Sequence, residues 1–250
     1  MKPSATYTLW LRNIKRYGRS KSRIIGSVAQ PLLFFLALGF GLGSVFSATG
    51  NKFDYLAFIA PGIIAMSVLF TSIFSGIQIL WDKQFGFLKE TLIAPVSRYS
   101  IMLGQTLGGA TTALIQGLIM MIIIFFFGKL NFGFGILIAL GFMALISIAF
   151  TSLGVAIASR MEDMQGFQLI MNFLVMPIFF LSGALFPITS LPSWLKTIVY
   201  INPLTYGIDG IRYGLSGAST FHPLVSLGVI GGFCLVMIFL GGFLFRKMKI

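Results

Sequence analysis

Few side chains in this sequence of 250 residues could take part in covalent chemistry. The single histidine, His222, has no carboxylate near it in the sequence, although a Ser-His-Asp arrangement needs both groups. Asp209 and Arg212 lie three residues apart, so they would share one face of a helix and could form an ion pair. An enzyme of any kind would therefore have to use Asp209, Arg212 or His222.

The patterns that bind nucleotides and metals are absent from the sequence. It contains no GxxxxGKS or GxxxxGKT stretch, so it has no P-loop to hold nucleotide phosphates. The six Asp and Glu residues are scattered over the loops, and neither HExxH nor CxxC spacing occurs. The single cysteine, Cys234, excludes an intrachain disulfide and a cysteine-based zinc site. We therefore expect no catalytic, cofactor-binding or metal-binding residue in this chain.

The elements that would have to position these few polar groups are strongly apolar. Hydrophobic residues make up 57% of the sequence and charged residues 10%, against about 25% charged residues in a typical soluble domain. The net charge of +12 could indicate a nucleic acid partner. However, seven of the 18 basic residues precede the first long apolar segment, where membrane proteins carry their orientation signal. We therefore expect contact with membrane lipid and no nucleic acid partner.

Six long apolar segments can each cross a membrane as a helix, because about 20 apolar residues span the ~30 Å hydrocarbon layer. They contain no Lys, Arg, Asp or Glu and lie at residues 24–46, 56–80, 102–127, 134–158, 167–187 and 224–245. No cleavage site follows the first segment, so we interpret it as a span and not as a signal peptide. We predict an all-α integral membrane protein with six transmembrane helices, in which residues 1–250 form a single transmembrane domain.

The distribution of positive charge predicts the orientation of the chain. With the N-terminus inside, fourteen of the Lys and Arg residues lie on the cytoplasmic side of the membrane and four lie outside. Connectors rich in Lys and Arg stay in the cytoplasm. We therefore expect both termini to be cytoplasmic.

Residues 1–23 form a basic leader, and residues 5–19 within it have the pattern of an amphipathic helix. Aromatic rings recur at helical spacing and basic side chains share another face, which is typical of a helix in the headgroup layer. A disordered basic leader is the alternative. The residues that define the expected surface helix are Trp10, Leu11, Arg12 and Ile14.

The connector between the second and third spans, residues 81–100, contains a second short amphipathic helix, which Pro95 ends. Its rings, Phe85 and Phe87, lie near Leu88. Exposed aromatic rings in a cytoplasmic loop need a partner. That partner could be another protein or the inner leaflet of the membrane, and the pattern leaves both open.

The last external connector, residues 188–223, is too apolar for a solvated loop. Prolines divide it into two amphipathic pieces that are too short to cross the bilayer. We therefore predict an external re-entrant helical hairpin between spans five and six. A pair of Asp209 with Arg212 would lower the cost of holding charge near hydrocarbon. The alternative is an exposed surface pair of little energetic weight.

The spans contain neutral polar side chains, whereas ion-coupled carriers need a titratable or cation-binding group near the middle of the membrane. A membrane protein that has no energy source and offers an aromatic helix to a cytoplasmic partner fits a subunit of an ATP-driven exporter. A stand-alone channel or ion-coupled carrier is the alternative. Glycine pairs would let helices approach closely within one subunit or between subunits. These pairs are Gly39/Gly43, Gly104/Gly108 and Gly228/Gly232.

Permeases of type-2 ABC exporters resemble this chain in two segments. These are the loop WDKQFGFLKETLIAPVSR, followed by Leu103-Gly104-Gln105, and the stretch FFLSGALFPITSLPSWLKTIVYINPLTYGIDGIRYGL. The resemblance is to the branch of daunorubicin-resistance and nodulation-factor permeases, and it covers essentially the whole chain.

In that family a separate ABC ATP-binding subunit binds ATP and magnesium, and it contacts the surface helix and the first cytoplasmic loop. The resemblance implies this partner, no cofactor in this chain, and a second permease copy in a homodimer or a closely related heterodimer. It also implies that the cytoplasmic coupling helix is formed by residues 84–92 and that the external hairpin closes the outer end of the pathway. The residues implied in ATPase coupling are Gln84, Phe85, Gly86, Phe87, Leu88, Glu90 and Arg98. Those implied in the hairpin are Asn202, Pro203, Asp209 and Arg212.

The resulting expectation is a permease subunit of an ATP-driven exporter in a prokaryotic plasma membrane. An uncharged membrane domain rich in aromatic residues suits an amphipathic or hydrophobic cargo. Such a cargo could be a drug-like molecule, as in multidrug efflux, or a lipid or glycolipid. The outward direction of transport comes from the resemblance alone.

Overall fold

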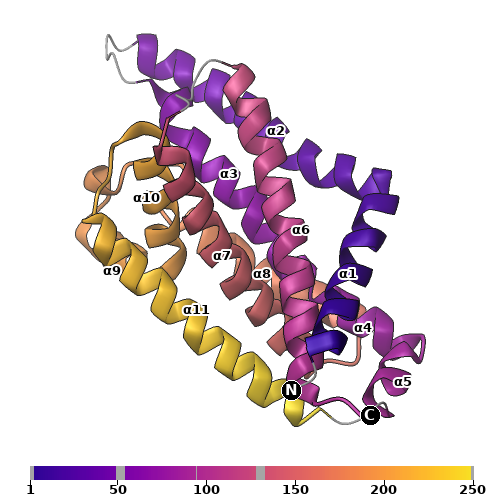
Figure 1. Ribbon diagram of the computed structural model, residues 1–250. Coiled ribbons are helices and arrows are strands. Elements are labelled where there is room, and N and C mark those ends of the chain that lie inside the picture. The colour runs from indigo at the N-terminus through magenta and orange to yellow at the C-terminus, as the bar shows by residue number, and fades with distance from the viewer. Residues whose placement is uncertain (1–2, 49–53, 94, 128–132, 249–250) are drawn as a thin grey trace.

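A computed structural model describes residues 3–48, 54–93, 95–127 and 133–248 (Figure 1). Within these ranges the chain is helical and contains no strand. The α-helices are α1 Pro3–Arg19, α2 Lys21–Ala48, α3 Tyr55–Phe74, α4 Ile77–Gln84, α5 Phe87–Ile93, α6 Arg98–Phe126, α7 Gly135–Ala158, α8 Met164–Phe180, α9 Ser193–Ile201, α10 Pro203–Ser216 and α11 Pro223–Arg246. A 3-10 turn, Ile188–Ser190, precedes α9. The prediction of an all-α fold is confirmed.

Five helical segments of the described chain are long and apolar enough to cross a membrane. They are Lys21–Ser44, Tyr55–Gln84, Arg98–Phe126, Gly135–Ala158 and Pro223–Arg246. These five segments overlap the first four predicted spans and the sixth, and they confirm a chain that crosses the membrane several times.

The fifth predicted span, 167–187, is wrong in its bounds. Helix α8 starts earlier, at Met164, because the Asp163 side chain accepts hydrogen bonds from the amides of Gln165 and Gly166. It ends at Phe180, and the chain turns at Gly183, whose φ of +69° favours glycine. Its 17 residues extend over about 26 Å, which is less than the usual hydrocarbon thickness.

The second predicted span, 56–80, is interrupted. Helix α3 ends at Phe74, and α4 continues beyond Ser75 and Gly76 as far as Gln84. A Cβ atom on Gly76 would lie 2.5 Å from the carbonyl oxygen of Gly154 on α7, so the two backbones meet at this break. The continuation carries Asp82, which lies two residues beyond the predicted end of this span.

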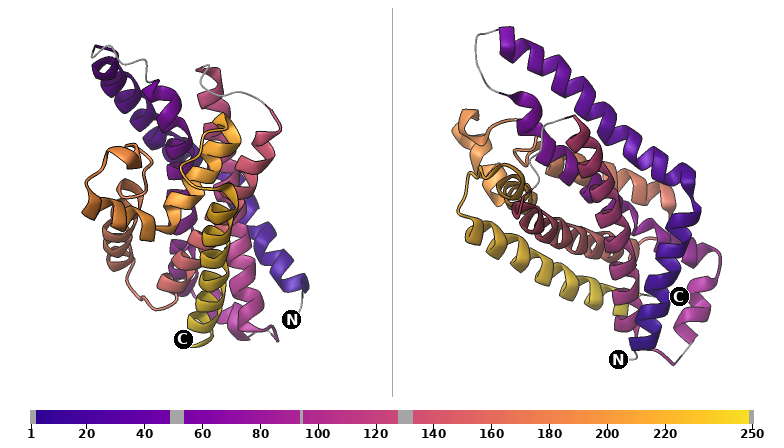
Figure 2. Two further views of the ribbon diagram at one scale, coloured as in Figure 1. Left: turned by 90° about the vertical axis from the view of Figure 1, so that its left-hand side faces the viewer. Right: turned by 45° about the horizontal axis from the view of Figure 1, so that its top comes forward.

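The helical bundle has two ends that contain different elements. The chain termini gather with α4 and α5 at one end, and α9 and α10 lie at the other (Figure 1). We refer to these as the terminus end and the hairpin end. Helices α2 and α11 lie on opposite sides of the bundle in the right-hand view of Figure 2. Termini that share one end are expected of an even number of crossings.

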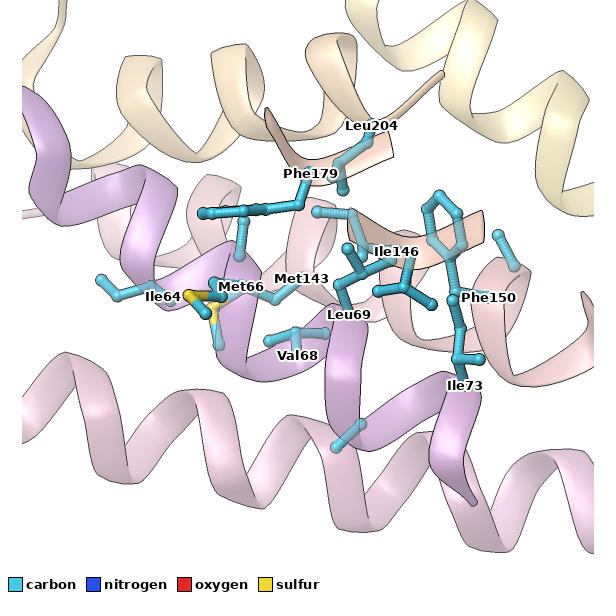
Figure 3. Close-up of a cluster of buried hydrophobic side chains, with 14 of the residues drawn as sticks. Ile64, Met66, Val68, Leu69, Ile73, Met143, Ile146, Phe150, Phe179 and Leu204 are labelled. Atoms are coloured by element: carbon cyan, nitrogen blue, oxygen red, sulfur yellow. The ribbon is translucent and has the colours of Figure 1, made fainter. Parts of the chain in front are cut away.

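The core forms around α3, of whose most apolar stretch 72% is buried, against 17% for α2. Small residues permit the close packing, because a Cβ atom on Gly62 would lie 2.6 Å from the carbonyl oxygen of Ala184. Side chains of α3, α7, α8 and α10 meet there (Figure 3). The labelled ones are Ile64, Met66, Val68, Leu69, Ile73, Met143, Ile146, Phe150, Phe179 and Leu204.

The glycine pairs have different surroundings. Cβ atoms on Gly104 and Gly108 would collide with Leu9 and Asn13 of α1, so this pair packs within the subunit. Gly39 similarly faces the Leu56 side chain of α3. In contrast, Cβ atoms on the pair of α11, Gly228 and Gly232, would meet no atom within 4 Å among the described residues.

We expect Gly108→Leu to separate α1 from α6 and to lower the free energy of unfolding by about 1–3 kcal/mol, the usual cost of overpacking. The readout is the rate of maleimide labelling of Leu9→Cys, because Leu9 is buried against α6. Labelling should be several-fold faster in Gly108→Leu. Gly228→Leu, at an open position, is the matched control and should leave the rate unchanged; equal rates in the two variants would contradict this packing.

Candidate functional site

Helix α1 packs on the protein with one side. Leu9 and Tyr17 are buried, and the Trp10 indole Nε1 donates to Thr111 Oγ1 of α6 over 3.0 Å. The predicted helix is therefore present, and the alternative of a disordered leader is wrong. Leu11 and Ile14, also named for this helix, are partly buried.

Tyr17 anchors the end of α1. Its hydroxyl donates to Gln116 Oε1 of α6 over 2.6 Å. Burial raises the pKa of the Tyr17 phenol above its ordinary value, so the hydroxyl keeps the proton that it donates.

Asp82 of α4 connects α1 with α6. Its side chain is buried, at 5% exposed, and it forms an ion pair with Arg12 of α1. Gln78 Nε2 donates to Asp82 Oδ1 over 3.2 Å, and Gln105 Nε2 of α6 donates to Oδ2 over 3.1 Å. A second α1 side chain, Asn13, donates to Gln105 Oε1 over 2.8 Å. We call this cluster of Arg12, Asn13, Gln78, Asp82 and Gln105 the Asp82 joint.

Asp82 was not among the predicted site residues, because its position in the connector at residues 81–100 gives no local sign of burial. A buried carboxylate is stable only when ionic and hydrogen-bonding partners surround it. The available signal was the leader itself, whose basic residues have no acidic neighbour while Asp82 follows an apolar segment. Arg12, predicted as part of the surface helix, supplies the pairing charge.

The Asp82 joint also reaches α5. The Arg12 guanidinium lies 4.2 Å from the centre of the Phe87 ring, a cation–π contact. Leu88 of α5 is buried, so it packs within the chain instead of being available to another protein. Lys83 adds a link to the connector between α7 and α8, with its Nζ 3.6 Å from Glu162 Oε1.

The predicted coupling helix, 84–92, is wrong at its start. Helix α4 ends at Gln84, Gly86 takes a φ of +78°, and α5 begins at Phe87. The left-handed conformation at Gly86 reverses the chain and separates two short helices. Phe85 therefore lies at a corner, where it is 73% exposed and stacks on Trp81 with ring centres 5.5 Å apart.

The other predicted coupling residues lie in two places. Gln84 and Glu90 are exposed near the Phe85 corner. Arg98 instead starts α6, and its Nη1 donates to the carbonyl oxygens of Arg246 and Met248 over 2.7 and 3.1 Å. Arg98 therefore caps the end of α11.

At the hairpin end, Asn202 joins three helices. Its Nδ2 donates to the carbonyl oxygens of Ile178 and Leu181 over 2.6 and 2.9 Å, which caps α8. Its Oδ1 accepts from the amide of Leu204 over 3.0 Å, and Pro203 occupies the first turn of α10. The predicted break into two short helices is present between α9 and α10, and the re-entrant position of these helices in the membrane stays a prediction.

Asp209 and Arg212 of α10 are 2% and 8% exposed, so the alternative of an exposed surface pair is wrong. They do not pair directly within 4 Å in the described chain. Asp209 instead accepts from the amide of Thr220 over 2.6 Å and from Ser226 Oγ of α11 over 3.2 Å. Arg212 Nη2 donates to the carbonyl oxygen of Gly183 over 3.2 Å.

These two charges therefore clamp the start of α11 and the turn after α8 onto α10. The Arg212 guanidinium also lies 4.4 Å from the centre of the Phe58 ring of α3. His222 caps α11, where its Nδ1 accepts from the amide of Leu224 over 3.4 Å. In the described ranges, no group of three or more His, Cys, Asp and Glu side chains could hold a metal ion. Buried charges therefore hold helices together at both ends of the bundle. They are the Asp82 joint at the terminus end and the contacts of Asp209 and Arg212, which we call the clamp, at the hairpin end.

Comparison with known proteins finds relatives along most of the chain. The sequence model of the ABC-2 type transporter family matches residues 4–216. Nodulation protein J of Rhizobium meliloti is 28% identical over 242 residues, which cover 96% of this chain and 92% of that protein. Nodulation protein J of Rhizobium leguminosarum bv. trifolii is 29% identical over 234 residues, covering 92% and 87%. The inner membrane transport permease YadH of Escherichia coli is 26% identical over 228 residues, covering 90% and 88%.

We expect Asp82→Asn to lower the free energy of unfolding by about 1–3 kcal/mol. Arg12, Gln78 and Gln105 all donate to this carboxylate, and the amide nitrogen of an asparagine would face a donor. Thermal unfolding of the detergent-solubilised protein measures the effect. Glu162→Gln breaks an ion pair at a side chain that is 89% exposed and is the control. An equal decrease in the free energy of unfolding in Glu162→Gln and Asp82→Asn would contradict the conclusion that buried Asp82 stabilises the terminus end.

Proposed function

The chain belongs to the ABC-2 type transporter family, and we propose that it exports an amphipathic or hydrophobic compound across a prokaryotic plasma membrane. It is the permease subunit of such a transporter and not an enzyme. Membership implies a separate ATP-binding subunit as its partner. We propose that this partner holds the ATP and magnesium, and that both termini of the permease face it in the cytoplasm.

The observation that carries the proposal is the exposed corner beside the Asp82 joint. Phe85 and Trp81 stack on each other at the terminus end, with Gln84 and Glu90 nearby. Exposed aromatic side chains beside polar groups are typical of a site that contacts a protein or a membrane, and the family supplies a protein partner. The corner is therefore proposed as the surface that contacts the ATP-binding subunit. Phe87 and Leu88 support it from within the chain.

The Asp82 joint would transmit a movement of this corner to other helices. A push on Phe85 would reach α1 through Arg12 and α6 through Gln105, because Asp82 binds both side chains. It would also reach α3, the most buried helix, across the break at Ser75 and Gly76. For ATP to drive transport, the nucleotide must favour one arrangement of these helices over the other.

The clamp at the hairpin end is the proposed outer closure. Opening a route outward would require α10 to move relative to α11 or to the turn after α8. Such a movement would break contacts of Asp209 or Arg212. Because both charges are buried, they must find new partners or water in the open state.

A second permease copy would cover the exposed faces of α2 and α8. Gln168 and Asn172 lie four residues apart on α8 and are exposed, as is Gln30 on α2. Amides that face hydrocarbon are unfavourable, so a partner subunit or a polar pathway between two subunits is the more stable environment. We propose a homodimer or a closely related heterodimer.

The proposal predicts that Phe85→Asp weakens binding of the ATP-binding subunit by about 30-fold, since central interface aromatics contribute about 2 kcal/mol or more. The affinity is measured with the permease in nanodiscs, and ATP hydrolysis stimulated by the permease should fall in parallel. Phe134→Asp, at a side chain 93% exposed, changes an aromatic residue away from the corner and is the matched control. Unchanged affinity in Phe85→Asp would refute the docking assignment.

A further inference from the structure

Two cavities meet where α1, α2 and α3 come together. The smaller, of about 30 Å³, lies between α1, the start of α2, α4 and α6 and includes Asn13 and Gln78 in its wall. The larger, of about 280 Å³, lies between α2 and α3. Tyr17 and Arg23 line both cavities, so the two cavities lie on either side of these side chains.

The charge at this junction is positive. Arg16 and Arg23 are the charged residues in the two walls, and neither wall contains a carboxylate. Arg16 lies 3.8 Å from Asp82, but that carboxylate already binds Arg12. No ion pair within 4 Å involves Arg23 in the described chain. The Arg23 guanidinium is therefore available to an anion.

The larger cavity changes character along the helices. Arg23 lies in the first turn of α2, directly after the end of α1, and it is exposed. About two turns further, Gln30 lines the cavity, and across it Phe70 and Phe74 of α3 supply an apolar wall. Thr71 adds a hydroxyl on the same side as the rings. A cavity with a cationic group at Arg23 and aromatic rings at Phe70 and Phe74 is complementary to an amphipathic molecule that has an anionic headgroup.

We infer that this cavity binds the anionic headgroup of an amphipathic compound at Arg23 and the first part of its apolar chain along Phe70 and Phe74. The headgroup would be a phosphate, sulfate or carboxylate, which are the anions that a guanidinium binds through charge-assisted hydrogen bonds. The inference rests on the proposed function insofar as it makes this compound the cargo. A lipid of the bilayer has the same chemistry and is the other source.

The test uses dodecyl phosphate as the probe and dodecyl maltoside as a neutral probe with the same chain. The permease is held in nanodiscs of phosphatidylcholine without the ATP-binding subunit, and binding is measured at equilibrium. Arg23→Gln should bind dodecyl phosphate at least about tenfold more weakly than the unaltered chain, because it loses a hydrogen bond to a charged group. Its affinity for dodecyl maltoside should not change.

Two variants control for charge and folding. Lys21→Gln removes an exposed positive charge two residues away that lines neither cavity, so it should bind dodecyl phosphate normally. Arg23→Lys keeps the charge and should retain most of the affinity. Equal binding by Arg23→Gln and Lys21→Gln, or equal affinity of the unaltered chain for the two probes, would overturn the inference.

Addition of phosphatidylglycerol to the nanodiscs identifies the source of the anion. Competition with dodecyl phosphate would assign the cavity to a bilayer lipid. Binding without competition, together with ATP-dependent transport of dodecyl phosphate in the complete complex, would assign it to cargo. Because binding needs no ATP-binding subunit, loss of the Arg23 effect would remove this inference alone, and failure of Phe85→Asp to weaken docking would remove only the proposed coupling surface.

Discussion

The buried carboxylate of Asp82 is the group on which the terminus end depends. An unpaired carboxylate in this position would be strongly unfavourable, so α1, α4 and α6 must stay together to supply Arg12, Gln78 and Gln105. Glycines on α6 make the required approach of α1 possible, since Cβ atoms at Gly104 and Gly108 would collide with it. The exposed Phe85 corner therefore lies beside a group of helices that buried polar contacts hold together.

The opposite end uses the same physical rule with different partners. Asp209 and Arg212 are buried and are satisfied mostly by backbone groups of neighbouring segments and not by each other. Buried charges that bind backbone groups connect segments that are distant in sequence. They can leave these backbone groups only when other polar groups or water solvate them instead. A joint at one end and a clamp at the other suit a subunit that transmits movement without carrying out chemistry.

The sequence predicted the features that depend on long-range apolarity or local stop signals. Apolar runs located the spans, and Asn202 followed by Pro203 located the break in the hairpin. The predictions from sequence were wrong or incomplete where contacts between distant segments determine the structure. The interruption after Phe74 reflects backbone contact between Gly76 and Gly154, and the pairing of Asp82 with Arg12 joins residues 70 positions apart. No local periodicity encodes either contact.

The central claim is that α1 and α5 move as one body when nucleotide acts on the partner subunit, while the hairpin end moves relative to them. Pulsed electron–electron resonance on a complex with one labelled permease copy would test it, using spin labels at the exposed positions Thr8 of α1, Glu90 of α5 and Thr197 of α9. The account predicts that the distance from Thr8 to Glu90 is the same with and without bound ATP and that the distance from Glu90 to Thr197 changes. A change in the first distance as large as that in the second would contradict it.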